Sequence, residues 1–303
     1  MTVVTQHVHP TAGALLKPAP FVYEAPSSLS EAVDCLAGYG DEAKVLAGGQ
    51  SLVPVLALRL ARFEALVDLN GVDELAFIRQ DDGHVVVGAM TRQATVEVDP
   101  LVLRSMPVLA AATRHIGHFQ IRNRGTLGGS IAHGDPAAEY PAVVVALDAT
   151  ISVMGPSGRR QIAAADCYDG PMTTTLADDE ILESVAFPVW GAGSGFAVRE
   201  MARREGDFAT AGVVAGVTIE DGRVSRAAVA LFGMGPTPIR ARAVEGQLVG
   251  IEASAIDLTE IGRAAVADID PPSDVHATGL YRRRVATRLV ADALQSAIQE
   301  AAA

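Results

Sequence analysis

Two short glycine-rich segments carry the residues best suited to binding a ligand. The first glycine segment, residues 46–53, reads LAGGQSLV, and the second glycine segment, residues 126–130, reads TLGGS. Paired glycines let a backbone approach a ligand closely and adopt positive φ at little steric cost. Successive backbone N–H groups and flanking hydroxyls can form a concavity that binds anions. Two such segments in one chain indicate a long, phosphate-bearing ligand that is held at both ends.

Neither segment matches a common nucleotide-binding or catalytic motif. The chain has no G-x-G-x-x-G between a strand and a helix and no G-x-x-x-x-G-K-[ST], so neither a Rossmann domain nor a P-loop NTPase is predicted. The G-x-S-x-G turn of a serine hydrolase is also absent. His115 and His118 lie close in sequence without an evident carboxylate partner, so the sequence does not predict a zinc site.

Composition argues against several classes of protein. The chain has 303 residues, of which 49% are hydrophobic, which is enough for a large core and about two domains. Its net charge of −12 and its 5% aromatic content argue against nucleic acid as a partner. There is no run of about 18 apolar residues, so no transmembrane segment is predicted, and no secretion signal is recognised. The two cysteines are too few for an iron–sulfur cluster, and their use is typical of a cytoplasmic protein.

The first glycine segment is expected to lie between two strands. Ser28-x-x-Glu31 is a capping box that predicts the start of a helix. Residues 44–47 read as a strand that enters the segment, and Ser51 can then cap a short helix. Residues 65–69 read as a buried strand. This order predicts a β–loop–α–β unit around the segment.

The second glycine segment is expected to lie between two helices. The predicted helix before it covers residues 101–116, and an apolar helix follows at 137–147. Hairpins are predicted at 76–89 and 150–164, and a strand at 181–187 ends at a proline.

A glycine-rich break then separates a further region. Three antiparallel strands are predicted beyond it, with an Asp-Gly turn between the last two. The helices expected after them cover residues 241–249, 259–267 and 276–300. The whole chain therefore reads as an α+β protein with an N-terminal arm at 1–17 and domains at 18–190 and 195–303.

Three motifs together resemble those of a known family. They read AGGQSLVPVLALR near Ala47, IRNRGTLGGSIAHGDPAAEYP near Ile121 and FAVREMARREGDFATAGV near Phe196. In this order they look like the FAD-binding medium subunit of molybdenum hydroxylases, a family that includes the carbon monoxide dehydrogenase medium chain and the FAD domain of xanthine dehydrogenase. The resemblance implies a vanillyl-alcohol-oxidase/PCMH-type FAD-binding domain of two α+β subdomains at 18–190. A small C-terminal domain with a three-stranded antiparallel sheet and helices would follow at 195–303.

The resemblance also implies which residues bind the cofactor. The pyrophosphate of FAD would be wrapped by the backbone N–H groups of Leu46, Ala47, Gly48, Gly49, Gln50, Ser51, Leu52 and Val53. The cradle would be continued from the other side by Thr126, Gly128, Gly129 and Ser130. Glu139 would form a hydrogen bond with the cofactor, and Ile116 and Leu182 would lie against its rings. Arg199 would stand near the flavin, where relatives often carry lysine, and its charge could stabilise the reduced flavin.

By this resemblance the chain is an electron-transfer subunit rather than a complete enzyme. FAD would take electrons from two [2Fe–2S] clusters and pass them to an external acceptor, because flavin bridges one- and two-electron chemistry. The molybdopterin–molybdenum centre would lie on a large partner subunit and the clusters on a small one, in a dimer of heterotrimers. No catalytic residue of this chain would be required. A cytoplasmic location is expected, with any membrane association made through the complex.

Two other functions remain open from the motifs. One is a free-standing FAD-dependent oxidoreductase with its own substrate site. It would need a catalytic acid–base pair or nucleophile near the flavin, and the sequence offers none. The other is a scaffold subunit that has lost its cofactor, and the intact glycine pairs of both segments argue against it.

Overall fold

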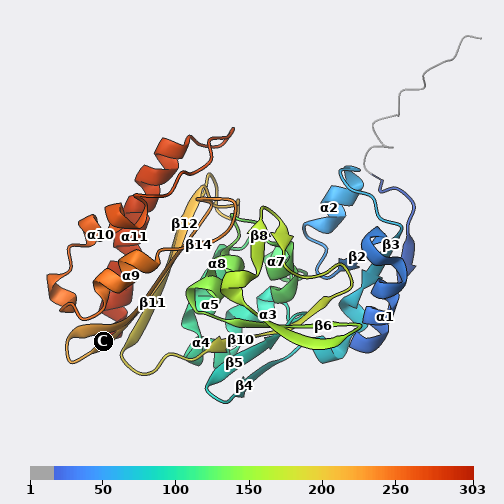
Figure 1. Ribbon diagram of the computed structural model, residues 1–303, viewed down its shortest axis with the longest axis horizontal. Coiled ribbons are helices and arrows are strands. Elements are labelled where there is room, and N and C mark those ends of the chain that lie inside the picture. Colours follow the sequence, from blue (N-terminus) through green and yellow to red (C-terminus); the bar gives the residue numbers. More distant parts are fainter. Residues whose placement is uncertain (1–16) are drawn as a thin grey trace, which may run out of the picture.

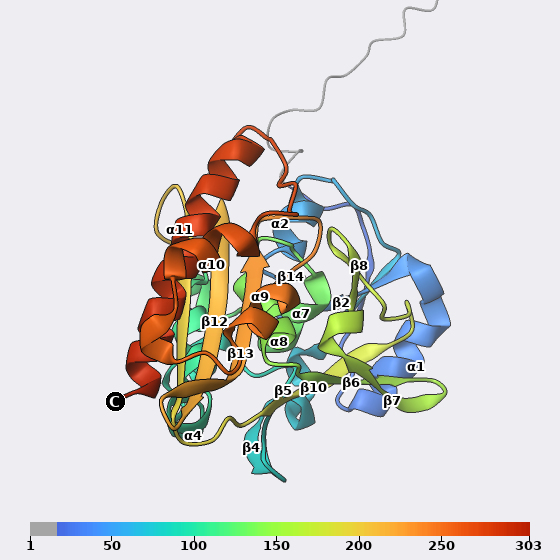
Figure 2. The same cartoon turned by 60° about the vertical axis from the view of Figure 1, so that its left-hand side comes forward.

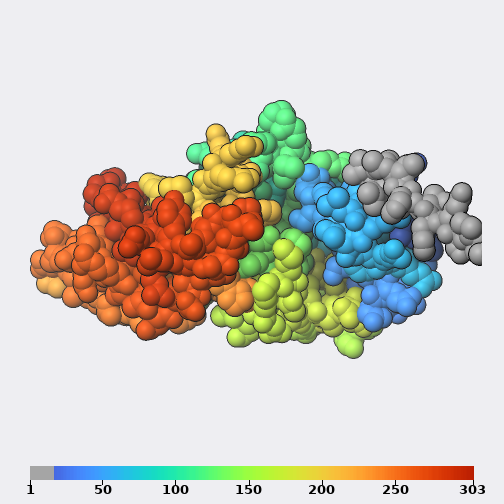
Figure 3. Space-filling view, turned by 90° about the horizontal axis from the view of Figure 1, so that it is seen from above, coloured from blue at the N-terminus to red at the C-terminus, as the bar shows by residue number. Residues whose placement is uncertain are grey.

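The computed structural model describes residues 17–303, so the expected N-terminal arm, except Lys17, lies outside the described residues. Figure 1 shows three regions that follow one another along the long axis of the molecule. A small sheet near the N-terminus forms one end, a larger sheet with helices forms the middle, and the C-terminal domain forms the other end. The space-filling view in Figure 3 shows the same order, from blue to orange and red.

The first region is a small parallel sheet. Its strands lie in the order β1 (Val22–Glu24), β3 (Ala65–Asp68) and β2 (Ala43–Leu46). Strand β2 leads through the first glycine segment into helix α2 (Leu52–Ala57), and the chain returns through β3. The β–loop–α–β unit predicted from the sequence is therefore confirmed.

Helix α1 (Leu29–Tyr39) covers this sheet. It begins after Ser28, whose hydroxyl accepts a hydrogen bond from the backbone N–H of Glu31 at 3.2 Å, as the capping box predicts. Its apolar face packs into a core shared with β2 and β3. The sheet edge that carries the first glycine segment is held in place by this core.

The second region is a five-stranded antiparallel sheet. Its strands lie in the order β4 (Ile78–Asp81), β5 (His84–Gly88), β10 (Ile181–Pro188), β6 (Thr150–Gly155) and β7 (Gly158–Ala163). A separate small ribbon is made by β8 (Tyr168–Gly170) and β9 (Thr173–Thr174). The helices of the region are α3 (Gln93–Val98), α4 (Pro100–Ser105), α5 (Pro107–His115), α6 (Phe119–Arg122), α7 (Leu127–His133) and α8 (Glu139–Ala146). Every residue of α8 is buried, which fits its largely apolar sequence.

The single helix predicted at residues 101–116 is two helices in the structure. Helix α4 ends at Ser105 and α5 begins at Pro107. Met106 between them has φ −141° and ψ 52°. A proline ring disfavours helical backbone at the preceding residue, which explains the break.

The C-terminal domain is an antiparallel sheet with helices on one face, as Figure 2 shows for α11. Its strands lie in the order β11 (Ser194–Met201), β12 (Ala211–Glu220), β13 (Arg223–Phe232) and β14 (Ile239–Arg240). The three long strands are those predicted, and the two-residue β14 adds a fourth at the edge. The helices are α9 (Arg242–Leu248), α10 (Leu258–Ala265) and α11 (Gly279–Ala301). Between residues 17 and 303, no helix combines the length and the apolar character that crossing a membrane requires.

The two faces of this sheet belong to two different cores. One face joins the core of the second region through Val198, Val214, Ala228, Ala230 and Phe232. The other face packs against the C-terminal helices through Ala197, Val213, Ala215, Val229 and Leu231. Because successive side chains of a strand point to opposite faces, strands buried on both sides must be apolar at nearly every position. The AGVVAGVT sequence of β12 meets this requirement.

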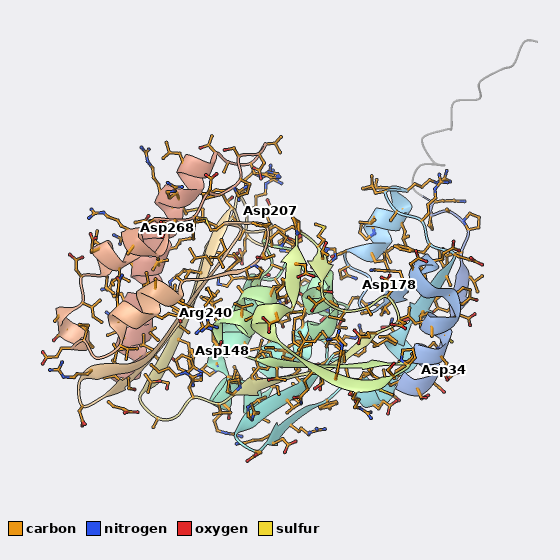
Figure 4. All side chains as sticks on the ribbon, in the orientation of Figure 1. Asp34, Asp148, Asp178, Asp207, Arg240 and Asp268 are labelled. Carbon is orange, nitrogen blue, oxygen red and sulfur yellow. The ribbon has the colours of Figure 1, made fainter. Side chains whose placement is uncertain are left out.

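Arg240 ties the C-terminal domain to the second region. Its guanidinium donates a hydrogen bond to the carbonyl oxygen of Val145 at 2.6 Å and lies 3.1 Å from Asp148 Oδ1. Figure 4 shows Arg240 and Asp148 side by side at this junction. Arg240 also pairs with Glu245, and the two side chains are 9% and 10% exposed. Arg240 therefore forms a buried ion pair within the C-terminal domain and also bonds to the second region.

We expect Arg240→Ala to lower the free energy of unfolding by about 3–5 kcal/mol, because it leaves the buried Glu245 carboxylate without its partner. The control Arg223→Ala removes a pair with Glu252 whose side chains are 55% and 57% exposed. It should cost at most about 1 kcal/mol. Urea denaturation of the whole chain measures both effects, and equal losses for the two variants would contradict the role given to Arg240.

Candidate functional site

The two glycine segments lie against each other, although more than seventy residues separate them in sequence. A Cβ atom on Gly48 would stand only 2.4 Å from the carbonyl oxygen of Arg124 and 2.7 Å from the Cα of Gly125. A Cβ atom on Gly129 would stand 3.2 Å from the Cβ of Ala47. The backbones therefore meet where side chains do not fit, and this contact brings the two segments to one place.

The first glycine segment presents free backbone donors. Within the described chain, the N–H groups of Gly49, Gln50 and Ser51 donate no hydrogen bond, whereas the N–H of Val53 donates to the carbonyl oxygen of Gly49 at 3.0 Å. Gly49 has φ +74°, which favours glycine, and the side chain of Gln50 donates to the carbonyl oxygen of Gly48 at 2.9 Å. Ser51 precedes α2 without its hydroxyl capping the helix. Three neighbouring N–H groups and a hydroxyl are thus available to an anion.

The second glycine segment differs, because its backbone donors are already used. The N–H of Gly128 donates to the carbonyl oxygen of Ala89 at 2.8 Å, that of Gly129 to Thr126 Oγ1 at 3.0 Å, and that of Ser130 to the carbonyl oxygen of Thr126 at 3.2 Å. A Cβ on Gly128 would also lie 2.5 Å from the Cβ of Ala89. Gly128 and the buried Thr126 therefore shape the start of α7. The half-buried Gly129 surface and the Ser130 hydroxyl remain for a ligand.

A cavity of about 300 Å³ opens beside the first glycine segment. It is lined by Gly48, Gly49, Gln50, Val53 and neighbouring backbone, together with Asp68, Asn70 and Arg124. Leu46 and Ala47 also line it at the end of β2. The cavity thus joins the first segment to the turn that precedes the second.

A polar network that sequence reasoning missed holds this cavity in shape. The amide of Asn70 donates to the carbonyl oxygen of Ala47 at 3.0 Å, and Arg92 Nη2 donates to Asn70 Oδ1 at 2.6 Å. Arg92 also donates to the carbonyl oxygen of Arg124, so one guanidinium links both sides of the cavity. Asp68 accepts from Tyr23 and from the N–H of Asn70. The available signal was the polar D-L-N-G turn that directly follows a buried strand.

Glu139 is a buried acid in the central region. It is the first residue of α8 and is 5% exposed. Burial raises the pKa of its carboxyl from 4.5 to about 8, and the negative charges of Glu200 and Asp135 contribute to this rise. The group is therefore mostly protonated at neutral pH and can donate a hydrogen bond to an acceptor atom of a ligand.

The other residues expected at the flavin fall in two places. Ile116 directly follows α5 and Leu182 lies on β10, and both pack in the central core. Arg199 lies instead on the α11 side of the C-terminal sheet, where its guanidinium donates to Ser296 Oγ at 2.8 Å. Alternation along β11 puts the neighbouring Glu200 on the opposite face, with Oε1 3.4 Å from His115 Nδ1. The structure therefore does not bring Arg199 to the glycine segments.

Without a bound ligand, the contribution of Glu139 to the stability of the chain should fall as the pH rises from 4.5 through about 8. The pKa of Glu139 is about 8 in the folded chain and ordinarily 4.5. Between pH 4.5 and about 8, the folded chain therefore binds more protons than the unfolded chain does. The stability that the protonated Glu139 contributes is complete below pH 4.5 and is lost as the pH rises through about 8. We expect Glu139→Gln to flatten this fall, measured by urea denaturation at a series of pH values. Glu220→Gln, at an exposed residue, is the control, and an unchanged slope in Glu139→Gln would exclude Glu139 as the responsible group.

Comparison with known proteins matches almost the whole described chain. Residues 19–190 match the family described as the FAD binding domain in molybdopterin dehydrogenase. Residues 196–297 match the family described as the CO dehydrogenase flavoprotein C-terminal domain. The 6-hydroxypseudooxynicotine dehydrogenase complex subunit alpha of Paenarthrobacter nicotinovorans is 39% identical over 287 residues, which cover 94% of this chain and 97% of that protein.

Solved structures agree with the sequence comparison. A chain of carbon monoxide dehydrogenase from Hydrogenophaga pseudoflava has a TM-score of 0.91 and 38% identity, with 93% of this chain and 99% of that chain covered. A chain of quinoline 2-oxidoreductase from Pseudomonas putida 86 has a TM-score of 0.89 and 36% identity, with 94% and 99% covered. Because both domain families match in order and the relatives are covered nearly end to end, the chain belongs to the FAD-binding medium subunits of the molybdenum hydroxylases.

Proposed function

We propose that this oxidoreductase subunit holds FAD between its two glycine segments and passes electrons from the [2Fe–2S] clusters of a partner subunit to an external acceptor. The observation that carries the proposal is the run of free N–H groups at Gly49, Gln50 and Ser51, of which Gly49 and Gln50 line a cavity that extends to Arg124, in the turn before the second segment. A diphosphate is the part of FAD that needs such donors, because its oxygens are charged acceptors. Residues 18–190 would bind the cofactor and residues 195–303 would form a separate C-terminal domain.

The two glycine segments would contribute to FAD binding in different ways. In the first segment, Leu46, Ala47, Gly48, Gly49, Gln50, Ser51, Leu52 and Val53 surround the diphosphate, with the donors at residues 49–51. In the second segment, Gly129 and the Ser130 hydroxyl face it, while Thr126 and Gly128 fix the backbone through hydrogen bonding and packing. Because Gly48 and Gly129 carry no Cβ atom, the two parts of the chain can approach each other closely at this point.

We assign the ring end of the cofactor to the buried Glu139 and to two apolar residues of the central core. Glu139 would hold a proton for a hydrogen bond with the cofactor, and Ile116 and Leu182 would exclude water from it. Arg199 is left out of the proposed contacts, because its guanidinium is committed to Ser296 on the far face of the sheet. FAD supplies the exchange between one- and two-electron transfer, and the protein supplies binding and orientation.

The remaining cofactors are assigned to partners. The two cysteines of this chain cannot provide the four thiolates that one [2Fe–2S] cluster needs. One relative is named as a subunit of a dehydrogenase complex, and the similar carbon monoxide dehydrogenase is described as lacking the Mo-pyranopterin moiety of its molybdenum cofactor. We therefore propose a large molybdopterin subunit and a small iron–sulfur subunit as partners, in a cytoplasmic dimer of heterotrimers.

The test compares two glycine variants in the complex purified from its native cells. The wild-type complex should contain three kinds of chain, flavin and iron–sulfur absorbance, and molybdenum. Gly48→Ala should remove most of the flavin and the reduction of acceptors, because its Cβ would collide with the Arg124 carbonyl oxygen, while metal content is kept. Gly246→Ala is the control, since a Cβ there meets no atom within 4 Å. Full flavin content in Gly48→Ala, or substrate turnover by the isolated chain, would contradict the proposal.

A further inference from the structure

The two arginines of the turn before the second glycine segment have different surroundings. Arg122 Nε lies 2.8 Å from Glu97 Oε2, and its Nη1 donates to the carbonyl oxygens of Ile116 and Gly117 at 3.1 and 3.0 Å. Arg122 therefore holds the backbone between α5 and α6. The guanidinium of Arg124 has no hydrogen bond or ion pair with any residue from 17 to 303, and the residue is exposed at the edge of the cavity.

The backbone of Arg124 is fixed next to the first glycine segment. Its N–H donates to the carbonyl oxygen of Ile121 at 3.1 Å, and its own carbonyl oxygen accepts a hydrogen bond from Arg92. The same oxygen is the atom that a Cβ on Gly48 would meet at 2.4 Å. The side chain of Arg124 therefore starts from a fixed backbone position next to Gly48.

The charges around the cavity favour an anion. The pKa of Arg92 is lowered by burial and, next, by the positive charge of Arg124, so the two guanidiniums lie within electrostatic reach of each other. Asp68 is the carboxylate that lines the cavity, and it is already bonded to Tyr23 and Asn70. Arg124 therefore lines the cavity together with one committed carboxylate, and Arg92 adds a second positive charge nearby, in a chain whose net charge is −12. A bound anion would relieve their mutual repulsion.

We propose that Arg124 binds the diphosphate of FAD from the side opposite to the N–H groups of Gly49, Gln50 and Ser51. This inference rests on the proposed function and adds to it the residue that selects ligands carrying a diphosphate. A guanidinium suits this position because its planar fork can donate two parallel hydrogen bonds to phosphate oxygens. Arg92 supports Arg124 by holding its carbonyl oxygen and adds positive charge behind it.

The test uses the assembled complex after its flavin has been removed, titrated with FAD, ADP and riboflavin. Arg124→Gln should weaken the binding of FAD and of ADP by about tenfold to a hundredfold, the range expected for a charged hydrogen bond. Riboflavin carries no phosphate, so its affinity should not change. The affinity of Arg124→Lys for FAD and ADP should fall between that of the wild type and that of Arg124→Gln, because lysine keeps the charge but lacks the planar fork of the guanidinium. The affinity for FAD should also depend less on salt in Arg124→Gln than in the wild type.

Arg104→Gln is the matched control, because Arg104 is an exposed arginine on α4 and does not line the cavity. If Arg124→Gln binds FAD and ADP as tightly as Arg104→Gln does, the role of Arg124 is overturned while the proposed function stands. If Arg124→Gln loses riboflavin equally, the substitution acts on the fold and the inference is again overturned. If the wild-type complex binds neither FAD nor ADP, the proposed function itself fails.

Discussion

The close contact between the backbones at residues 47–49 and 124–129 is the constraint on which the site depends. A Cβ on Gly48 would stand 2.4 Å from the carbonyl oxygen of Arg124, and a Cβ on Gly129 would stand 2.7 Å from Thr126 Oγ1 and 3.2 Å from the Cβ of Ala47. The contact joins a parallel sheet to a helix of the antiparallel region, so two structurally separate parts of the chain create one cavity. Asn70 and Arg92 then bridge the same gap with side-chain hydrogen bonds. The first segment is thereby left with its donors free, because its shape is maintained by other groups.

The C-terminal sheet contributes to the central core and to the surroundings of Glu139. One face of the sheet forms part of the central core around α5 and α8, and the other face carries the C-terminal helices. Because successive side chains of a strand point to opposite faces, the position of a polar residue along β11 decides whether it faces the central core. Glu200 and His115 meet on the inner side, whereas Arg199 is held by Ser296 on the outer side. The buried carboxyl of Glu139 responds to this arrangement, since the charge of Glu200 helps to raise its pKa.

Local signals in the sequence predicted much of the fold. The capping box at Ser28, the strand before the first glycine segment and the three long C-terminal strands all depend on short-range chemistry, and the structure contains each of them. The break at Met106 was missed although Pro107 signalled it. The network of Asp68, Asn70 and Arg92 depends on which distant residues meet, and periodicity carries no such information. The same is true of Arg199, whose direction is set by the register of β11 against its neighbours.

The central claim is that the N–H groups of Gly49, Gln50 and Ser51 receive the diphosphate of FAD. Amide hydrogen exchange of the complex, measured by mass spectrometry with and without FAD, tests it most directly. We expect exchange to slow strongly across residues 49–51 when FAD binds and to change much less at residues 128–130, whose N–H groups are already hydrogen-bonded within the protein. Unchanged exchange at residues 49–51 in a complex that has bound FAD would contradict the claim.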